Sequence, residues 1–276
     1  MSASPQYRIK VLEKALAVLE LFDEPGKELT VTEIGERLGI HKTTAFRIAA
    51  VLDGSNFLEK APGSMRYRLG YKIFHLGSFV EGGAELKRRA RPILEELKHE
   101  CDETVHLVVL SKGEALYLDK IEGRKTVRVV SRVGMTLPAH CSGVGKVLLA
   151  HLPDEQVEGI VQAKGLKRFT PNTITDRRAL RAELLRIRER GYALDDEEIE
   201  IGLKCVAAPI EDASGTVIGA LSISGPAFRF DGKEAERLIA LALQAATRVS
   251  DAMKGAAPSR GAKERRAPRA RGQDAA

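Results

Sequence analysis

The most constraining feature of this sequence is the stretch from Thr30 to Arg68, in which short helical patterns alternate with turn residues. Thr30 and Glu33 have the spacing of a capping box, in which each side chain accepts a hydrogen bond from the other residue's backbone N–H. Gly39 follows this first helical pattern, and glycine at such a position ends a helix in the left-handed conformation. The sequence therefore predicts a short helix that begins after Thr30 and ends at Gly39.

A second helix is expected directly after this turn, over residues 42–53. Its apolar residues recur at helical spacing and are expected to face a core: Ala45, Ile48, Ala49 and Leu52. The opposite face then carries Lys42, Thr43, Thr44 and Arg47. Two helices joined by a glycine turn, with small polar and basic residues on the second, form a helix-turn-helix. Its second helix enters the major groove of DNA.

Two flanking patterns favour this motif over an ordinary helical hairpin with a solvated face. Upstream, apolar residues at helical spacing predict a third packing helix: Val11, Leu12, Ala15, Val18, Leu19 and Phe22. Downstream, residues 57–60 and 66–69 flank the turn sequence Pro62-Gly63-Ser64, which predicts a β-hairpin with a basic tip. Three helices followed by such a hairpin form a winged helix-turn-helix. The wing would hold the DNA backbone through Lys60, Arg66 and Arg68.

The placement of charge supports a nucleic-acid partner more strongly than its total does. The whole chain has a net charge of +6 and a pI near 9.2. Residues 254–276 hold seven Lys/Arg against two Asp/Glu and so carry most of the excess. Residues 41–70 have a net charge of +3, whereas residues 1–40 have one of −2. The positive charge thus lies where the groove helix and the wing are expected, as phosphate contacts require.

After the wing, helical patterns alternate with runs of β-branched residues. Helices over residues 71–79 and 85–100 would connect the domains, and their apolar side chains suit a dimer contact. Strands are expected over residues 104–110, 115–121, 126–132, 204–210 and 216–222. Further helices are expected over residues 142–152, over 176–190 with Thr175 as the cap, and over 232–253. Helices mixed with an antiparallel sheet predict an α+β domain.

The segment Leu137–Leu149 contains Gly143-Val144-Gly145-Lys146 but does not form a nucleotide-binding loop. A Walker motif needs a glycine where His140 stands and Ser or Thr where Val147 stands. What remains is a glycine-rich turn at a helix N-terminus, where free N–H groups and the helix dipole favour an anion such as a carboxylate. The alternative is that the glycines only allow the helix to pack closely on the sheet.

Cysteine and histidine placement indicates neither catalysis nor metal binding. Cys101, Cys141 and Cys205 are odd in number and widely spaced. His140 precedes Cys141, but neighbouring side chains rarely meet, and no acid is placed to orient the histidine. We therefore expect no catalytic residue, no metal site and no cofactor. The sequence shows neither a signal core nor an apolar run of membrane-spanning length, so we expect a cytoplasmic protein without membrane contact.

Several longer motifs, in order along the chain, resemble the IclR-type bacterial transcription regulators. They lie in Ser131–Leu149, Arg168–Thr175, Arg190–Glu198 and Lys204–Pro226, and Met65–Gly70 resembles the closing strand of the family's wing. The resemblance covers about residues 7–253. It implies a winged helix-turn-helix domain, a linker helix and a GAF-like effector domain. It also implies binding to a double-stranded DNA operator as a homodimer or a dimer of dimers.

The resemblance further implies a small-molecule pocket in the second domain. In relatives that recognise small oxo-acids, the pocket residues match Ser142, Gly143, Val144, Asp195, Cys205, Ser222 and Ser224. Ser222 and Ser224 alternate on one expected strand and so face the same side. Asp195 would repel an anion unless it is protonated or accepts a hydrogen bond from a ligand hydroxyl. Residues 201–204 depart from the Pro-Gly pair that many relatives have before the cysteine.

We therefore predict a transcription regulator whose operator affinity depends on a small carboxylate or aromatic acid. The expected regions are the winged helix-turn-helix (7–70), a linker helix (71–90), the effector-binding and oligomerisation domain (91–254) and a disordered basic tail (255–276). One rival is an enzyme in which DNA binding is vestigial. The other is a metal or redox sensor, for which the sequence lacks clustered ligands and a paired thiol.

Overall fold

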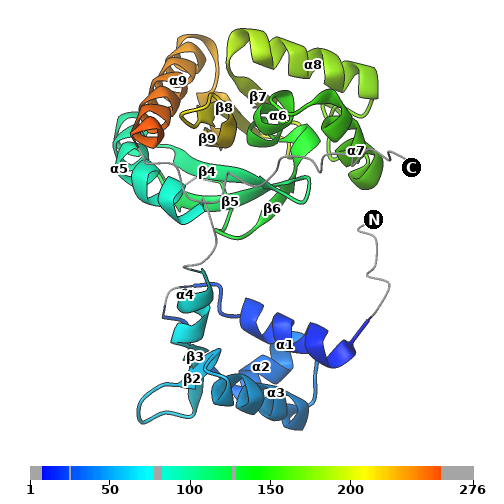
Figure 1. Ribbon diagram of the computed structural model, residues 1–276, viewed down its shortest axis with the longest axis vertical. Coiled ribbons are helices and arrows are strands. Elements are labelled where there is room, and N and C mark those ends of the chain that lie inside the picture. The colour runs from blue at the N-terminus through cyan, green and yellow to red at the C-terminus, as the bar shows by residue number, and fades with distance from the viewer. Residues whose placement is uncertain (1–7, 25, 78–82, 126–128, 256–276) are drawn as a thin grey trace, which may run out of the picture. The chain divides into compact units, whose positions relative to one another are not determined.

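The computed structural model describes residues 8–24, 26–77, 83–125 and 129–255 (Figure 1). The chain forms two compact units, Met1–Glu81 and Gly82–Ala276. The first unit is mainly helical, and the second combines helices with a six-stranded antiparallel sheet. This arrangement confirms the α+β class predicted from the sequence.

The expected linker helix, residues 71–90, is divided between the two units. Helix α4 (Tyr71–Gly77) belongs to the first unit and α5 (Gly83–Cys101) to the second. Residues 78–82 between them lie outside the described residues, as does the expected basic tail beyond Gly255.

The first unit contains the three predicted helices and the predicted hairpin. The helices are α1 (Lys10–Glu20), α2 (Val31–Leu38) and α3 (Lys42–Gly54), and the hairpin strands are β2 (Leu58–Lys60) and β3 (Arg66–Leu69). The capping box is confirmed, because Thr30 accepts from the Glu33 N–H and Glu33 accepts from the Thr30 N–H at 2.7 Å. Gly39 ends α2 at φ 62°, in the left-handed region. A two-residue strand that the sequence did not predict, β1 (Leu29–Thr30), pairs with β3.

The core of this unit contains the apolar residues of α3 that were predicted to face inward, but only part of the apolar stripe predicted for α1. Ala45, Ile48 and Ala49 are buried, while Leu52 packs partly buried against them. On α1, Val18 is buried, whereas Val11 and Leu12 are 63% and 53% exposed. The expectation that those two residues pack inward is wrong. Val11 follows the same helical stripe as Val18, but it lies two turns nearer the N-terminus, where the small core does not reach.

The sheet of the second unit has the strand order β6-β5-β4-β9-β8-β7. The strands are β4 (Thr104–Ser111), β5 (Glu114–Ile121), β6 (Thr136–Pro138), β7 (Ala193–Asp196), β8 (Leu203–Glu211) and β9 (Val217–Pro226). The remaining helices are α6 (Gly143–Ala150), α7 (Asp154–Lys164), α8 (Arg177–Arg190) and α9 (Gly232–Lys254). The two central strands, β4 and β9, pair directly, so residues distant in the sequence share one sheet face.

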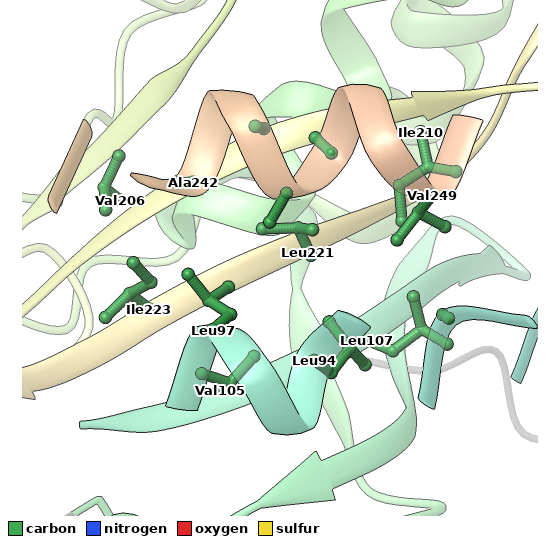
Figure 2. Packing of buried hydrophobic residues seen from close by; sticks show 14 of the residues in the cluster. Leu94, Leu97, Val105, Leu107, Val206, Ile210, Leu221, Ile223, Ala242 and Val249 are labelled. Atoms are coloured by element: carbon green, nitrogen blue, oxygen red, sulfur yellow. The ribbon is translucent and has the colours of Figure 1, made fainter. Parts of the chain in front are cut away.

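Helices cover both faces of this sheet (Figure 1). Helices α5 and α9 pack side by side on one face, and Figure 2 shows Leu94 and Leu97 of α5 among the strand residues Val105, Leu107 and Leu221. The sequence predicted that the apolar side chains of α5 are exposed for a dimer contact. That prediction is wrong for Leu86, Ala90, Leu94 and Leu97, which are buried in this core because the apolar stripe of the helix lies against the sheet.

Helices α6 and α8 pack together, and α6 contacts β4, β5, β7, β8 and β9 on the opposite face of the sheet. We call this face the α6 face. Register places on it Ala207, Ala220 and Val108, which pack against the apolar residues of α6. The α6 face therefore consists of the alternate strand residues that do not enter the α5 and α9 core.

Two local predictions differ from the structure. Residues 129–132 form no strand, and Lys120 instead binds the Ser131 carbonyl at 2.7 Å; residues 126–128 lie outside the described residues. Helix α8 is capped by Asp176, not by Thr175, because the Asp176 carboxylate accepts from the Ala179 N–H at 2.9 Å. The Thr175 hydroxyl accepts a hydrogen bond from Arg168 instead. Helix α7 and strands β6 and β7 were not predicted.

Within the described ranges, no helix has the length and apolar character needed to cross a membrane.

Candidate DNA-binding surface and effector site

The outer face of α3 presents the predicted polar residues to solvent. Lys42, Thr43 and Arg47 are exposed and Thr44 is half-buried. Neither Lys42 nor Arg47 forms an ion pair with another described residue, so both charges are available to a partner. The helix is capped by His41, whose Nδ1 accepts from the Thr43 N–H at 3.3 Å. Phe46 is also exposed on this face, although the sequence did not single it out.

The predicted basic residues of the wing have partners inside the first unit. Arg66 pairs with Glu33 at 3.1 Å, and Arg68 pairs with Glu59 at 2.7 Å. The Lys60 ammonium lies 5.8 Å from the centre of the Tyr67 ring. The expected basic tip is wrong, because these residues lie on the strands and the turn between them, residues 61–65, has no charged side chain. The Arg66–Glu33 pair instead ties the wing to the start of α2.

The predicted effector residues on the sheet form a polar row across the α6 face. Asp195 of β7 is opposite Cys205 of β8, and Cys205 is opposite Ser224 of β9. Ser222 lies two residues before Ser224, so both hydroxyls face the same side. All four side chains are buried. The structure thus brings together residues that the sequence separates by up to 29 positions.

The start of α6 closes over this row. Gly143 approaches so closely that an added Cβ would lie 2.7 Å from the Cys205 sulfur. Ser142 caps the helix, because its hydroxyl accepts from the Gly145 N–H at 3.2 Å. The amides of Gly143 and Val144 precede the first intrahelical bond and lack a helical acceptor, and the Val144 side chain packs into the core. Of the two sequence hypotheses for the glycines, close packing is confirmed, and it brings the helix N-terminus to the polar row. Anion binding at this helix start stays a prediction.

Two polar residues of β4 join the same face, and the sequence did not identify them as site residues. His106 is opposite Ser222, and Thr104 is opposite Ser224. The His106 Nε2 lies 2.8 Å from the Ser131 hydroxyl, and its Nδ1 lies 3.4 Å from Ser222 and 3.5 Å from Ser224. Complete burial lowers the pKa of His106 to about 3, so the ring is neutral. The available signal was that Thr104 and His106 alternate with apolar residues at the start of this strand.

A buried ion pair lies behind the helix start. Lys146 of α6 binds Glu198, and both side chains are almost completely buried. Acidic runs such as Asp195-Asp196-Glu197-Glu198 are usually solvated loops, but here only the middle two residues reach solvent. Asp195 accepts from the Glu198 N–H at 2.8 Å, and burial raises the pKa of Asp195 to about 7. The outer residues of the acidic run are therefore buried beside α6 and do not form a solvated loop.

The cysteines have the properties of packed thiols. All three are buried and free. Burial raises the pKa of Cys141 to about 12 and that of Cys205 to about 12, which keeps both protonated at neutral pH. His140 binds the Lys167 carbonyl at 3.0 Å and does not activate Cys141. Within the described residues, no group of three or more His, Cys, Asp or Glu side chains could hold a metal ion.

A winged helix-turn-helix followed by an α/β domain with a buried polar site defines a DNA-binding regulator with a sensor domain. Family models agree with this class. The model for the IclR helix-turn-helix domain matches residues 11–62, and that for the bacterial transcriptional regulator IclR C-terminal domain matches residues 80–251. The chain belongs to the IclR family of transcriptional regulators, and it is therefore a DNA-binding regulator and not an enzyme.

Individual relatives support this membership over nearly the whole chain. The transcriptional regulator XynR of Escherichia coli (strain K12) is 37% identical over 226 residues, which cover 82% of this chain and 90% of XynR. The crystal structure of the Thermotoga maritima IclR has a TM-score of 0.73 at 34% identity, covering 89% of this chain and 99% of that one. An IclR homologue from Microbacterium hydrocarbonoxydans, complexed with 4-hydroxybenzoate, has a TM-score of 0.73 at 29% identity, covering 88% and 99%.

Proposed function

We propose that this regulator binds its operator through α3 and the wing, and that a small organic acid bound on the α6 face changes its operator affinity. The observation that carries the effector proposal is the convergence of the α6 N-terminus with Asp195, Cys205, Ser222 and Ser224 on one buried face. Helix N-termini and hydroxyl groups are both suited to hold a carboxylate.

On the DNA side, the residues of α3 carry the specificity. Arg47 is the best candidate for a base or phosphate contact, and Lys42, Thr43 and Thr44 lie around it near the helix start. The exposed Phe46 adds an apolar group suited to a thymine methyl. The wing residues Lys60, Arg66 and Arg68 contribute to phosphate contacts, with Arg66 and Arg68 exchanging their internal carboxylate partners for phosphates.

The electrostatics of the α6 face favour a ligand with one negative charge. Its cations Lys146 and Lys120 are paired with Glu198 and Glu122 respectively. A single carboxylate is satisfied by helix amides and hydroxyls. A second carboxylate would be buried on the same face without a compensating cation, because both of these lysines already have an ion-pair partner. We therefore infer a monocarboxylate, and the relative bound to the aromatic acid 4-hydroxybenzoate supports this class.

Asp195 makes effector binding depend on pH. Its pKa of about 7 means that the carboxyl is largely neutral at pH 6 and largely ionised at pH 8. Ionisation places a negative charge beside the bound anion, so effector affinity should fall as pH rises through 7. Asp195→Asn should keep the affinity seen at low pH and remove most of this dependence. An unchanged pH profile in Asp195→Asn would place the carboxyl outside the site.

Self-association is the third part of the proposal. Exposed apolar residues occur on α1, at its N-cap and on α4 of the first unit: Ile9, Val11, Leu12, Leu16, Tyr71, Phe74 and Leu76. A homodimer would cover such surfaces and would dock on two half-sites spaced by about one helical turn or a multiple of it. An effector changes operator affinity only if it binds two protomer arrangements unequally, and the coupling is reciprocal.

The test is to titrate the protein into fluorescent DNA from the promoter region of its own gene. The titration is run at two salt concentrations and with a panel of small aliphatic and aromatic acids. We expect specific binding that weakens with salt and that one class of acids shifts by about tenfold. Specific binding that no acid alters would refute the effector proposal and leave the DNA-binding role intact.

A further inference from the structure

Resting on the proposed function, we propose that strand β4 completes the effector site, with Thr104 contacting the effector and His106 positioning the hydroxyls of Ser222 and Ser224. A ligand that meets both ends of this site is a monocarboxylate with a hydroxyl or carbonyl group several bonds from the carboxylate. Neither β4 residue belongs to the set that the family resemblance implied.

Thr104 carries the ligand contact because its hydroxyl has no partner among the described residues. The residue is 1% exposed, and its Oγ1 forms no hydrogen bond with any described residue. Buried polar groups in native proteins nearly always have partners, because leaving one unpaired costs free energy. Valine has the same shape without that cost. A ligand group that bonds to this hydroxyl, which lies on the same face as Ser224 and directly opposite it, explains why the position carries threonine.

The spacing of the row fixes which end of the ligand Thr104 meets. Adjacent strands lie about 4.8 Å apart, so Thr104 is one strand beyond Ser224 and two strands beyond Cys205. The α6 amides lie over Cys205, since Gly143 is in contact with its sulfur. A carboxylate held between these amides and Ser224 leaves the rest of the ligand pointing toward β4. Thr104 therefore meets a polar group at the distal end.

His106 acts on the carboxylate end through the two serines. A neutral imidazole has one N–H donor and one acceptor nitrogen. If Nδ1 carries the proton, it donates to Ser222 and Ser224, and the two hydroxyl hydrogens are free to donate to a carboxylate. The Ser131 hydroxyl, 2.8 Å away, then donates to Nε2. The opposite tautomer would engage the serine hydrogens itself, so an anionic ligand favours the first arrangement.

Thr104 is tested with matched pairs of acids that differ only by a distal hydroxyl: 4-hydroxybenzoate with benzoate, and 4-hydroxybutyrate with butyrate. Calorimetric titration of the full chain should show that the hydroxyl member of one pair binds about tenfold more tightly. Thr104→Val should abolish this preference and leave the affinity for the parent acid unchanged. Thr104→Ser should retain it. The same change on the surface of α9, Thr247→Val, should have no effect, because that exposed hydroxyl donates only to the Leu243 carbonyl.

Thermal melting separates ligand loss from misfolding. Because Thr104→Val removes an unpaired buried hydroxyl, the unliganded variant should melt at the same temperature as the parent chain or above it. If Thr104→Val melts at the temperature of the parent chain but loses the tenfold difference in affinity between paired acids, Thr104 contacts the ligand. Preserved discrimination in Thr104→Val would overturn the inference while the proposed function stands. Failure of every acid to bind the parent chain would overturn both.

His106 is tested by replacing one ring nitrogen at a time. The amide of His106→Asn lies near the Nδ1 position and can still donate to Ser222 and Ser224, whereas that of His106→Gln lies near Nε2 and reaches only Ser131. We expect His106→Asn to bind both members of a pair within a few-fold of the parent chain and His106→Gln to bind both about tenfold more weakly. Equal losses in the two folded variants would overturn the positioning role.

Discussion

The outer face of α3 and the α6 face of the second unit are both polar surfaces, but they hold their polar groups in opposite ways. On α3, Lys42 and Arg47 are exposed and have no ion-pair partner among the described residues. On the α6 face, Asp195, His106 and Lys146 are buried and each has a partner. The first surface can therefore change without cost to folding, whereas a change to one of these buried, paired groups alters stability and recognition together.

The largest expected effect is on the Lys146–Glu198 pair. Lys146→Met leaves the Glu198 carboxylate buried without its cation, and breaking such a pair costs about 3–5 kcal/mol of unfolding free energy. The double variant Lys146→Met/Glu198→Met should regain most of this loss, because two apolar side chains remove the uncompensated charge. Urea denaturation measures both.

The matched control for this prediction is Lys164→Met. Lys164 pairs with Glu114 at 3.3 Å in a site where both side chains are about a third exposed. Removing a solvated pair of this kind should cost about 1 kcal/mol or less. If Lys146→Met cost no more than Lys164→Met, the contrast between buried and exposed polar groups would not hold for the second unit.

The next effect is at the contact between α6 and β8. Gly143→Ala places a methyl group 2.7 Å from the Cys205 sulfur and should cost about 1–3 kcal/mol. Cys205→Ala removes the obstructing sulfur, so the double variant should lose less than the two single changes added together. The control is Gly159→Ala on α7, which should raise the unfolding free energy. Apart from adjacent residues and the helix's own backbone, no described atom lies within 4 Å of the added Cβ, and alanine stabilises a helix by about 0.5–1 kcal/mol relative to glycine. Additive losses in the double variant would argue against the close approach.

The elements that could be predicted from the sequence are those defined by local chemistry. The capping box at Thr30, the turn at Gly39 and the hairpin around Gly63 depend on residues a few positions apart. Strands β1 and β7 have only two and four residues. They are strands because they pair with β3 and β8, and such pairing cannot be read from the local sequence. The apolar stripe of α5 was recognised, but periodicity alone does not tell a sheet-facing stripe from a partner-facing one.

Sequence motifs predicted only some of the residues of the candidate site. Ser222, Ser224, Asp195 and Cys205 all came from the family resemblance, and strand alternation added only that the two serines face the same side. Lys146 and Glu198 are 52 positions apart, and the acidic run around Glu198 is typical of a solvated loop. Only the pairing of β7 with β8 turns Asp195 inward opposite Cys205. His106 and Thr104 become neighbours of the serines through the β4–β9 pairing, which no local pattern shows.

A smaller effect is expected where the first unit joins its helix-turn-helix to its wing. Thr30→Ala removes the hydroxyl that accepts from the Glu33 N–H and should cost about 1 kcal/mol. Because Glu33 also binds Arg66 of the wing, the loss of the cap should weaken operator binding modestly as well. Thr32→Ala, an exposed change within the same helix, should have almost no effect on either measurement. A stability loss without any change in operator affinity would show that the cap and the wing act independently.

The smallest effect on stability, and the clearest on function, is expected at Arg47. Its side chain is exposed and has no ion-pair partner in the part of the chain that the structure describes, so Arg47→Ala should change the unfolding free energy by no more than about 0.5 kcal/mol. A base-edge contact by arginine contributes about 1–3 kcal/mol to DNA recognition, so operator affinity should fall by about tenfold or more and specific binding should be lost.

The control for Arg47→Ala is Arg178→Ala on α8 of the second unit. Arg178 is also exposed, and its replacement should leave operator affinity unchanged. Fluorescence anisotropy with operator and scrambled DNA at one salt concentration separates specific from nonspecific loss. Unchanged operator affinity in a folded Arg47→Ala variant would contradict the placement of α3 in the groove, and a large stability loss would remove the contrast between the two polar surfaces.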